Sequence, residues 1–241
     1  MSLQDGRRML RSNWDILGTP DQKKGAPLPE RQKACPPDAS TTRLPPPEFT
    51  GLSDVKLVDA ILNRRSRRKY LPDSLTQQEL SFLLFATQGV QKELKQSSLR
   101  PPASAGARHP FELYLSVFRV DGIAPALYRY LPFDHSLCLV NDRADLREAS
   151  EEALEGQGWD SAATLFWTAI PYRMEWRYTV ASPKLIALDA GHSCQNLYLA
   201  CEAIGCGTCA IGAYDQEKCD ALLGVDGVDE LTVYAAPVGK V

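Results

Sequence analysis

Apolar residues crowd the stretch from Ser182 to Gly212, which predicts one long helix followed by a glycine-rich loop. We expect the helix to span Pro183–Ile204, with Ser182 as N-cap and Pro183 at the first helical position, where a missing N–H costs nothing. Gly205 is expected to end it, because the residue just past a C-cap often takes positive φ. Few positions around the helix are polar, so it should lie at the centre of the fold.

One polar stripe interrupts this apolar helix. Asp189, Ser193 and Asn196 follow an i, i+4, i+7 spacing, which places them on one face. Buried polar side chains need hydrogen-bond partners. We therefore expect an interior hydrogen-bond network along this stripe.

Shorter periodic patterns predict the helices around the central one. Ser53 is expected to cap a helix that ends near Asn63 and carries Val55, Val58, Ile61 and Leu62 on one face. Thr76 and Glu79 form a capping box for a second helix, which should end at Gly89. Further helices are expected over 142–154 and 215–223.

The strand pattern is clearest over residues 111–118, where apolar and polar residues alternate. Further strands are expected over 126–130, 137–140, 164–170 and 230–237, and residues 171–181 read as a loop rich in aromatic and basic residues. Helices and strands interleave without a βαβ rhythm, and at least one adjacent strand pair looks antiparallel. This indicates the α+β class.

Residues 1–50 are rich in proline and poor in apolar runs, which predicts an extended arm laid across the body or across a partner subunit. Residues 51–241 are then the folded domain. The arm still carries possible anchors, such as Trp14 and Phe49.

Composition narrows the classes of function. The 241 residues are 24% charged and 44% hydrophobic with a net charge of −3, which gives no general attraction to nucleic acid or anionic membrane. No apolar run is long enough to span a bilayer and no secretion signal is visible, so we expect a cytoplasmic protein. We expect the seven cysteines to be free thiols, and no His or Cys spacing predicts a metal site.

Five of the six residues from Arg64 to Lys69 are cationic, with Ser66 among them. A solvated basic run or a nucleic-acid patch is the alternative, but no second basic stripe supports the latter. Guanidinium groups match phosphate oxygens, so a phosphate monoester suits this run.

The pattern Gly205-x-Gly207-x-x-Ala210 follows a helix rather than a strand, which argues against a Rossmann site. Small residues in the 103–110 and 210–213 loops would let backbone N–H groups approach a flat ring, and flavin is the natural candidate.

Five ordered motifs carry a family resemblance: RRSxRKY at 64–70, SAGARHPFELY at 104–114, LDAGHxxQNLYLA at 188–200, GxGTCAIGAYD at 205–215 and YAAPVGK at 234–240. This order resembles the nitroreductase-like FMN flavoproteins, and within them the SagB/ThcOx-type dehydrogenase branch. The resemblance implies a central sheet, mixed or antiparallel, flanked by helices. It also implies a homodimer that binds two FMN molecules at an interface formed by the long central helix.

The resemblance also assigns roles to residues. Arg64, Arg65 and Ser66 would hold the FMN phosphate end, and Arg68 would lie beside flavin N1 and O2. The Gly212 N–H would face N5. The remaining cofactor-binding candidates are Ser104, Ala105 and Gly106, contributed by the other subunit, together with Ile211, Ala213 and Lys240. Gly212 and Arg68 are therefore the expected catalytic positions.

The implied activity is FMN-dependent reduction of a small organic acceptor. It would proceed by hydride transfer in a ping-pong cycle, with NAD(P)H as electron donor. Two alternatives stay open. One is oxidation of azolines in a peptide, as in the SagB/ThcOx branch, and the other is flavin binding without turnover. Ala107 departs from the asparagine common at its position in simpler nitroreductases, and the chain stops soon after Lys240. We expect residues 1–50 to supply part of the dimer wrapping that a longer tail gives elsewhere.

Overall fold

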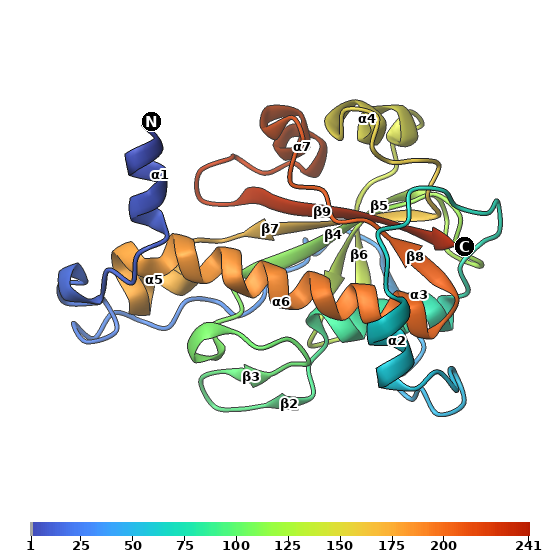
Figure 1. Ribbon diagram of the computed structural model, residues 1–241. Helices are drawn as coiled ribbons and strands as arrows, with labels where there is room; N and C mark the ends of the chain where they lie inside the picture. The colour runs from blue at the N-terminus through green and yellow to red at the C-terminus, as the bar shows by residue number, and fades with distance from the viewer. Residues whose placement is uncertain (1) are drawn as a thin grey trace.

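A seven-stranded sheet lies between two layers of helices in the computed structural model, which describes residues 2–241 (Figure 1). The strand order is β1-β6-β5-β4-β7-β9-β8 and every neighbouring pair is antiparallel. The strands are β1 (Thr41–Arg43), β4 (Phe111–Val117), β5 (Ala126–Leu131), β6 (Ser136–Asn141), β7 (Ala163–Ala169), β8 (Cys206–Thr208) and β9 (Leu231–Lys240); β2 (Lys92–Glu93) and β3 (Ser98–Leu99) form a separate hairpin. The α+β class is confirmed.

Each face of the sheet has its own hydrophobic core. On one face α3 (Gln77–Gln88) and α6 (Ser182–Ala203) pack over residues such as Leu113 and Trp167. On the other, α4 (Leu146–Ala153) and α7 (Gln216–Leu223) cover residues such as Phe166. The remaining helices are α1 (Leu3–Met9), α2 (Leu57–Asn63) and α5 (Tyr172–Tyr178). No helix among residues 2–241 is long and apolar enough to cross a membrane.

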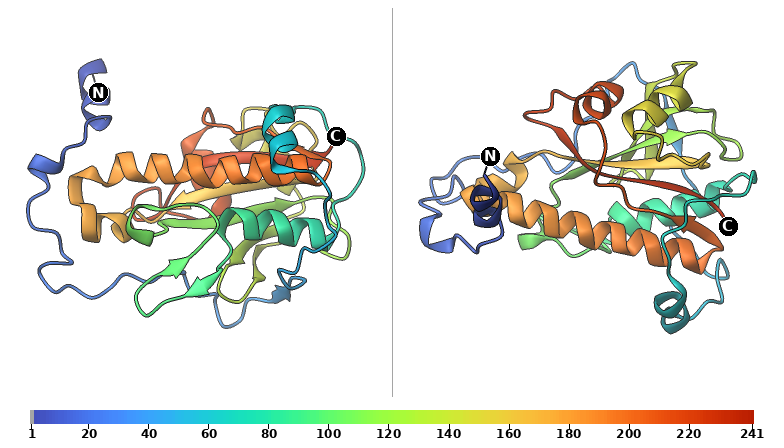
Figure 2. Two further views of the ribbon diagram at one scale, coloured as in Figure 1. Left: turned by 60° about the horizontal axis from the view of Figure 1, so that its bottom comes forward. Right: turned by 45° about the horizontal axis from the view of Figure 1, so that its top comes forward.

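The predicted central helix is α6, which runs the length of the body (Figures 1 and 2). Its N-cap is Ala181, one residue before the predicted Ser182, because the Ser182 hydroxyl donates back to the Thr179 carbonyl instead of capping. Gly205 follows the helix with φ of +66°, as expected.

The predicted polar stripe is an interior network. Ser193 Oγ accepts from Trp167 Nε1 (2.8 Å) and donates to the Thr87 carbonyl (2.8 Å). Asn196 donates to the Ala86 carbonyl, and Asp189 accepts from the Ala105 N–H. The stripe therefore fixes α6 against α3 and against the loop that holds Ala105.

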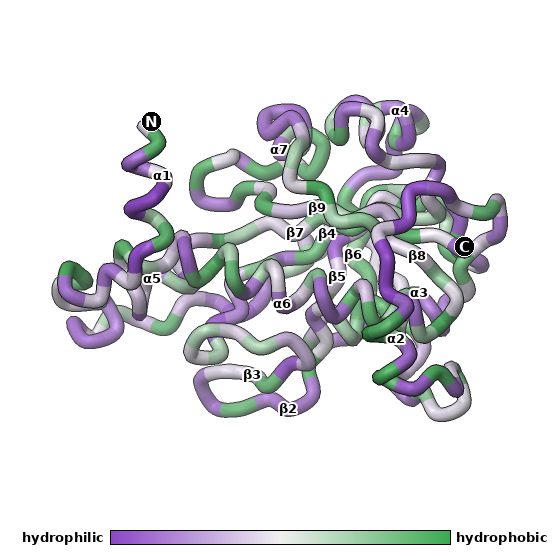
Figure 3. Tube along the Cα trace, viewed as in Figure 1, coloured by the Kyte–Doolittle hydropathy of each residue, from purple (hydrophilic) through white to green (hydrophobic). Residues whose placement is uncertain are grey.

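Two local predictions were wrong. The helix predicted from Ser53 begins only at Leu57, since the Ser53 hydroxyl donates to the Ala203 carbonyl. The apolar face of this helix is exposed, and Ile61 is 57% exposed. Figure 3 shows these hydrophobic residues on a helix at the periphery. Residues 171–181 are not a loop, because α5 forms there and buries Arg173, Met174 and Trp176.

The arm, residues 2–50, runs along the body from the start of α6 toward α2 (Figure 2). Trp176 Nε1 donates to the Ala26 carbonyl, and β1 pairs with β6 at the edge of the sheet. The short α1 at the start of the arm buries none of its residues. The arm therefore lies on its own chain over most of its length.

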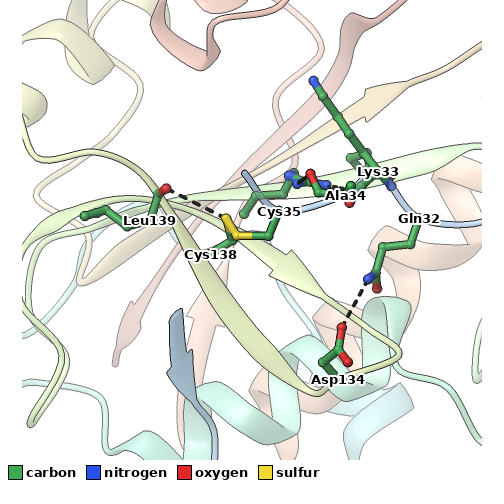
Figure 4. The surroundings of a disulfide bond; sticks show 9 residues. Gln32, Lys33, Ala34, Cys35, Asp134, Cys138 and Leu139 are labelled. Atoms are coloured by element: carbon green, nitrogen blue, oxygen red, sulfur yellow. Dashed lines mark hydrogen bonds and ion pairs between the residues drawn. A yellow bond between two sulfur atoms is a disulfide. The ribbon is translucent and has the colours of Figure 1, made fainter. Parts of the chain in front are cut away.

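A disulfide joins Cys35 of the arm to Cys138 of β6, a sequence separation of 103 residues (Figure 4). The expectation that all seven cysteines are free was therefore wrong for this pair. The cause is long-range: Arg129 holds the carbonyls of Lys33 and Ala34 at 2.7 Å each, which brings Cys35 over β6. The other five cysteines are free and buried.

Candidate active site

The cationic run lies between α2 and the glycine-rich strand β8. Ser66 forms a parallel bridge with Thr208, and the Arg67 N–H donates to the Thr208 carbonyl at 2.9 Å. Gly207 is required for this approach, because a Cβ there would lie 2.6 Å from the Arg67 side chain. The fold thus fastens residues 64–68 to the start of the 208–213 loop.

The cations of this run have no acidic partner among the described residues. Every ion pair within residues 2–241 involves other side chains. The Nε of Arg67 is buried without a hydrogen-bond partner, a state that costs free energy unless a ligand satisfies it. An anion is the ligand that this group of donors would accept.

Tyr198 of α6 connects the two loops. Its hydroxyl lies 3.1 Å from Ser66 Oγ and accepts a hydrogen bond from the Ala210 N–H at 2.8 Å. The Arg64 guanidinium lies over the Tyr198 ring, 5.1 Å from its centroid. One side chain therefore fixes the basic run relative to the 210–213 loop. Tyr198 lies in the LDAGHxxQNLYLA motif, but the motif alone predicted no role for it.

Arg68 extends from the same run toward the other side of the 210–213 loop. Its guanidinium is 5.6 Å from the centroid of the Trp159 ring. Two residues before Trp159, Gln157 donates to the Ala213 carbonyl at 2.7 Å. Arg68 is therefore connected to the 210–213 loop through the segment that holds Gln157 and Trp159, a connection that no sequence pattern indicated.

Ile211 fixes the 210–213 loop to the sheet, and Gly212 is its exposed part. Ile211 exchanges two backbone hydrogen bonds with Ala235 and is buried. Gly212 and Ala213 are exposed, and within the described residues their N–H groups make no hydrogen bond. The Gly212 N–H is therefore available to a ligand, which fits the role predicted for it.

A cavity of about 570 Å³ opens beside Gly212, and we call it the Gly212 cavity. Its walls come from α5, the first half of α6, β7, β9 and the arm residue Met9. They are mostly apolar, and include Ile186, Ala187, Ala190, Leu231, Val233 and Tyr234. Glu175 is the carboxylate among its lining residues. The cavity suits an aromatic or otherwise apolar molecule.

The predicted residues Ser104, Ala105 and Gly106 lie elsewhere in the chain. Their loop is held by Asp189, which accepts from the Ala105 N–H at 3.2 Å. Asp189 projects about 110° away from the mean direction of the α6 residues that line the Gly212 cavity, because successive helical residues are about 100° apart. The lining of that cavity does not include Ser104, Ala105 or Gly106. One chain therefore does not bring this loop to Gly212.

Gly106 is closely packed against the end of α5. Its φ is +58°, and a Cβ there would lie 2.5 Å from the Tyr178 hydroxyl. The C-terminal end of α5, in the segment predicted as an aromatic loop, therefore packs against the Ser104–Gly106 loop. Its middle, at Glu175, belongs with the Gly212 cavity.

Lys240 and the cysteines are the remaining candidate residues of the sequence motifs. The Lys240 ammonium is ion-paired with Glu79, so it would have to leave that carboxylate to contact a phosphate. Burial raises the pKa of Cys206, in the Cys-x-x-Cys segment, to about 12. This thiol stays protonated at neutral pH, which makes it a poor nucleophile. No cluster of metal-ligating side chains occurs among residues 2–241.

Comparison with known proteins places these features in a family. The family model described as "Nitroreductase family" matches residues 61–240. A curated protein of Methanocaldococcus jannaschii that is named as a nitroreductase is 32% identical over 195 residues, covering 80% of this chain and 95% of that protein.

Solved structures agree with this match. One from Ralstonia eutropha, described as a nitroreductase, is 25% identical with a TM-score of 0.68, covering 88% of this chain and 97% of that one. Another so described, from Anabaena variabilis, is 26% identical with a TM-score of 0.67 and is matched over 85% of this chain. This chain spans 42% of the length of the Anabaena protein.

Proposed function

This chain belongs to the nitroreductase family, and we propose that it takes a hydride from NAD(P)H and delivers it to a small organic acceptor, with FMN as cofactor. When bound, FMN would supply the alternating acceptance and donation of the hydride. The acceptor class that we propose is a nitro compound or a quinone. The observation that carries the proposal is the unpaired cationic run, which Tyr198 holds against the loop bearing the free Gly212 N–H.

The residues present fit the phosphate end of FMN. Arg64, Arg65 and Ser66 would hold it, since they lack acidic partners and lie beside the buried, unpaired Nε of Arg67. Arginine forks are well suited to phosphate oxygens. Lys240 could join them only by exchanging Glu79 for the phosphate.

The residues around the 210–213 loop fit the ring end. The N–H groups of Gly212 and Ala213 have no partner among the described residues, so they would bind the ring edge. A guanidinium held in place beside a ring that gains negative charge on reduction favours the reduced form. Arg68, fixed against Trp159, would have this role.

We also propose that the active unit is a homodimer built on α6 and α2. Leu188 on α6 and Ile61 and Leu62 on α2 are at least half exposed in the single chain, and large exposed apolar patches mark interaction surfaces. The Ser104–Gly106 loop is held by Asp189 of α6 and does not contribute to the lining of the Gly212 cavity. A second chain packed on α6 with two-fold symmetry would bring its own Ser104–Gly106 loop toward the Gly212 of the first.

The test begins with the absorbance spectrum of the purified protein and identification of the chromophore released by denaturation. FMN is expected, in a protein whose mass by light scattering is that of a dimer. Anaerobic mixing with NADH and with NADPH should then bleach the flavin, and a nitroarene or quinone should restore its colour. Absence of bound FMN after addition of excess FMN refutes the proposal.

Two outcomes of the same experiment select the alternatives. Flavin that is bound but stays oxidised with both nicotinamides indicates a binding protein without turnover. Flavin that is reduced instead by an azoline-containing peptide indicates a peptide dehydrogenase.

A further inference from the structure

Glu175 brings a carboxylate to the wall of the Gly212 cavity. The residue lies in the middle of α5, whose neighbouring side chains Met174 and Trp176 are buried and fix the helix. Within residues 2–241 the Glu175 carboxylate makes no hydrogen bond and no ion pair with another side chain, and the other walls of the cavity are mostly apolar. Glu175 is exposed, so its carboxylate is accessible to a charged group on a molecule bound in the cavity.

The surrounding charges leave this carboxylate without compensation. Burial, and then the negative charge of Asp229, raise the pKa of Glu175 above its usual value. Three basic residues line the adjoining hollow: Arg8, Arg11 and Lys184. Arg8 pairs with Asp5 at 3.8 Å and Lys184 donates to the Leu10 carbonyl at 2.7 Å, while Arg11 makes no ion pair with a described residue. None of the three is paired with Glu175. Glu175 is therefore an unpaired carboxylate at this wall, with Asp229 as a second negative charge close enough to act on it.

We propose that Glu175 makes the Gly212 cavity selective for acceptors that carry a positive charge on an apolar or aromatic body. The apolar wall would hold the body beside the flavin ring that the Gly212 N–H would bind, and the carboxylate would pair with an ammonium or amidinium group. This inference rests on the proposed function only in taking the bound molecule to be the acceptor. The charge preference itself can be measured as binding, without turnover.

The experiment uses three nitrobenzenes that differ in one substituent: 4-nitrobenzyltrimethylammonium, 4-nitrobenzyl alcohol and 4-nitrobenzenesulfonate. Their dissociation constants are measured by calorimetry or by NMR titration with the purified full-length protein. The variants are Glu175→Gln, Asp229→Asn and Glu217→Gln. Glu217 is an exposed acid on α7 without an ion pair among the described residues, so it serves as the matched control.

We expect the wild type to bind the cation more tightly than the alcohol, and the sulfonate least. Glu175→Gln should weaken cation binding about 5-fold, the scale of a partly exposed ion pair, and leave the alcohol within about 2-fold. Asp229→Asn should give a smaller loss of the same sign, and Glu217→Gln none. Raising the salt concentration should shrink the preference.

Equal binding of the three probes to the wild type overturns the inference. So does a Glu175→Gln variant that keeps the wild-type preference. Where the enzyme turns over, kcat/KM for the three probes should follow the same order. Failure to bind or reduce flavin counts against the proposed function instead, and leaves the binding comparison to decide the role of Glu175.

Discussion

Replacing Cys35 with serine should destabilise the protein by removing the link between the arm and β6. The disulfide closes a loop across a sequence separation of 103 residues. In the chain-entropy description, a closed loop of about 100 residues stabilises the fold by up to about 4.7 kcal/mol at 25 °C, while measured effects are typically about 2–4 kcal/mol. We therefore expect Cys35→Ser to lose about 3 kcal/mol.

For a chain of this size, each kcal/mol shifts Tm by roughly 2–4 °C. The expected loss therefore corresponds to a fall of roughly 6–12 °C, which calorimetry under non-reducing conditions would detect. Alkylation of the denatured, unreduced protein should label five cysteines in the wild type and one more in the variant. Adding a reductant should bring the wild type close to the variant and change the variant little.

Two results would refute this reasoning. One is a Cys35→Ser protein within about 0.5 kcal/mol of the wild type, and the other is labelling of all cysteines in the unreduced wild type. The measurement also bears on location. Disulfides are uncommon in cytosolic proteins outside hyperthermophiles, so an intact bond in protein taken directly from cells would count against the predicted cytoplasmic location.

Three further predictions follow from the site and the core. Arg68→Ala should weaken FMN binding or lower the FMN reduction potential, both measured by spectroscopic titration, whereas Lys69→Ala in the same run should leave both near wild type. Tyr198→Phe removes the acceptor of the Ala210 N–H and should raise the FMN dissociation constant about 5-fold, the scale of one hydrogen bond of about 1 kcal/mol; an unchanged constant contradicts the linking role. Burial and the neighbouring Arg100 lower the pKa of His109 to about 3. As pH falls below about 6.5, this histidine therefore becomes protonated in the unfolded chain but stays neutral in the folded one. The free energy of unfolding should then drop by about 1.4 kcal/mol per pH unit between pH 6 and pH 4. Urea titrations at several pH values should show that the free energy of unfolding depends less steeply on pH in the His109→Asn variant than in the wild type.

Local patterns were enough to predict most of the elements. The capping box of Thr76 and Glu79 forms as expected, and so does the cap of α7 by Asp215. These signals lie within a few residues of the element they define, so they survive in any tertiary context. The shortest strands of the seven-stranded sheet, β1 and β8, could not be predicted, because three residues carry no period and form strands only through their partners.

The wrong predictions concern contacts that single helices do not determine. The apolar side of α2 has the period of a buried face, but in one chain nothing covers it. The α5 segment reads as a loop because its charges look exposed, yet Arg173 is buried and donates to the buried Glu112. An ion pair between residues 61 positions apart cannot be seen from either residue alone.

The site was predicted in its parts and not in its connections. The basic run, the Ser104–Gly106 loop and the Gly212 loop were located by motif, and the first and third do lie together. The connecting side chains Tyr198 and Trp159 were not assigned, since an aromatic residue in an apolar stretch reads as core. The roles of the predicted residues toward FMN remain predictions.

The position of β9 constrains when this molecule can be completed. Residues 231–240 lie in the sheet between β7 and β8, and β7 is made about seventy residues earlier. During synthesis β7 must therefore wait beside an open sheet edge, with its ladder donors and acceptors unpaired, until residue 240 has left the ribosome. A nascent chain halted shortly before that point would expose this edge to other chains, so cells that make the protein would need it released quickly or shielded by a chaperone.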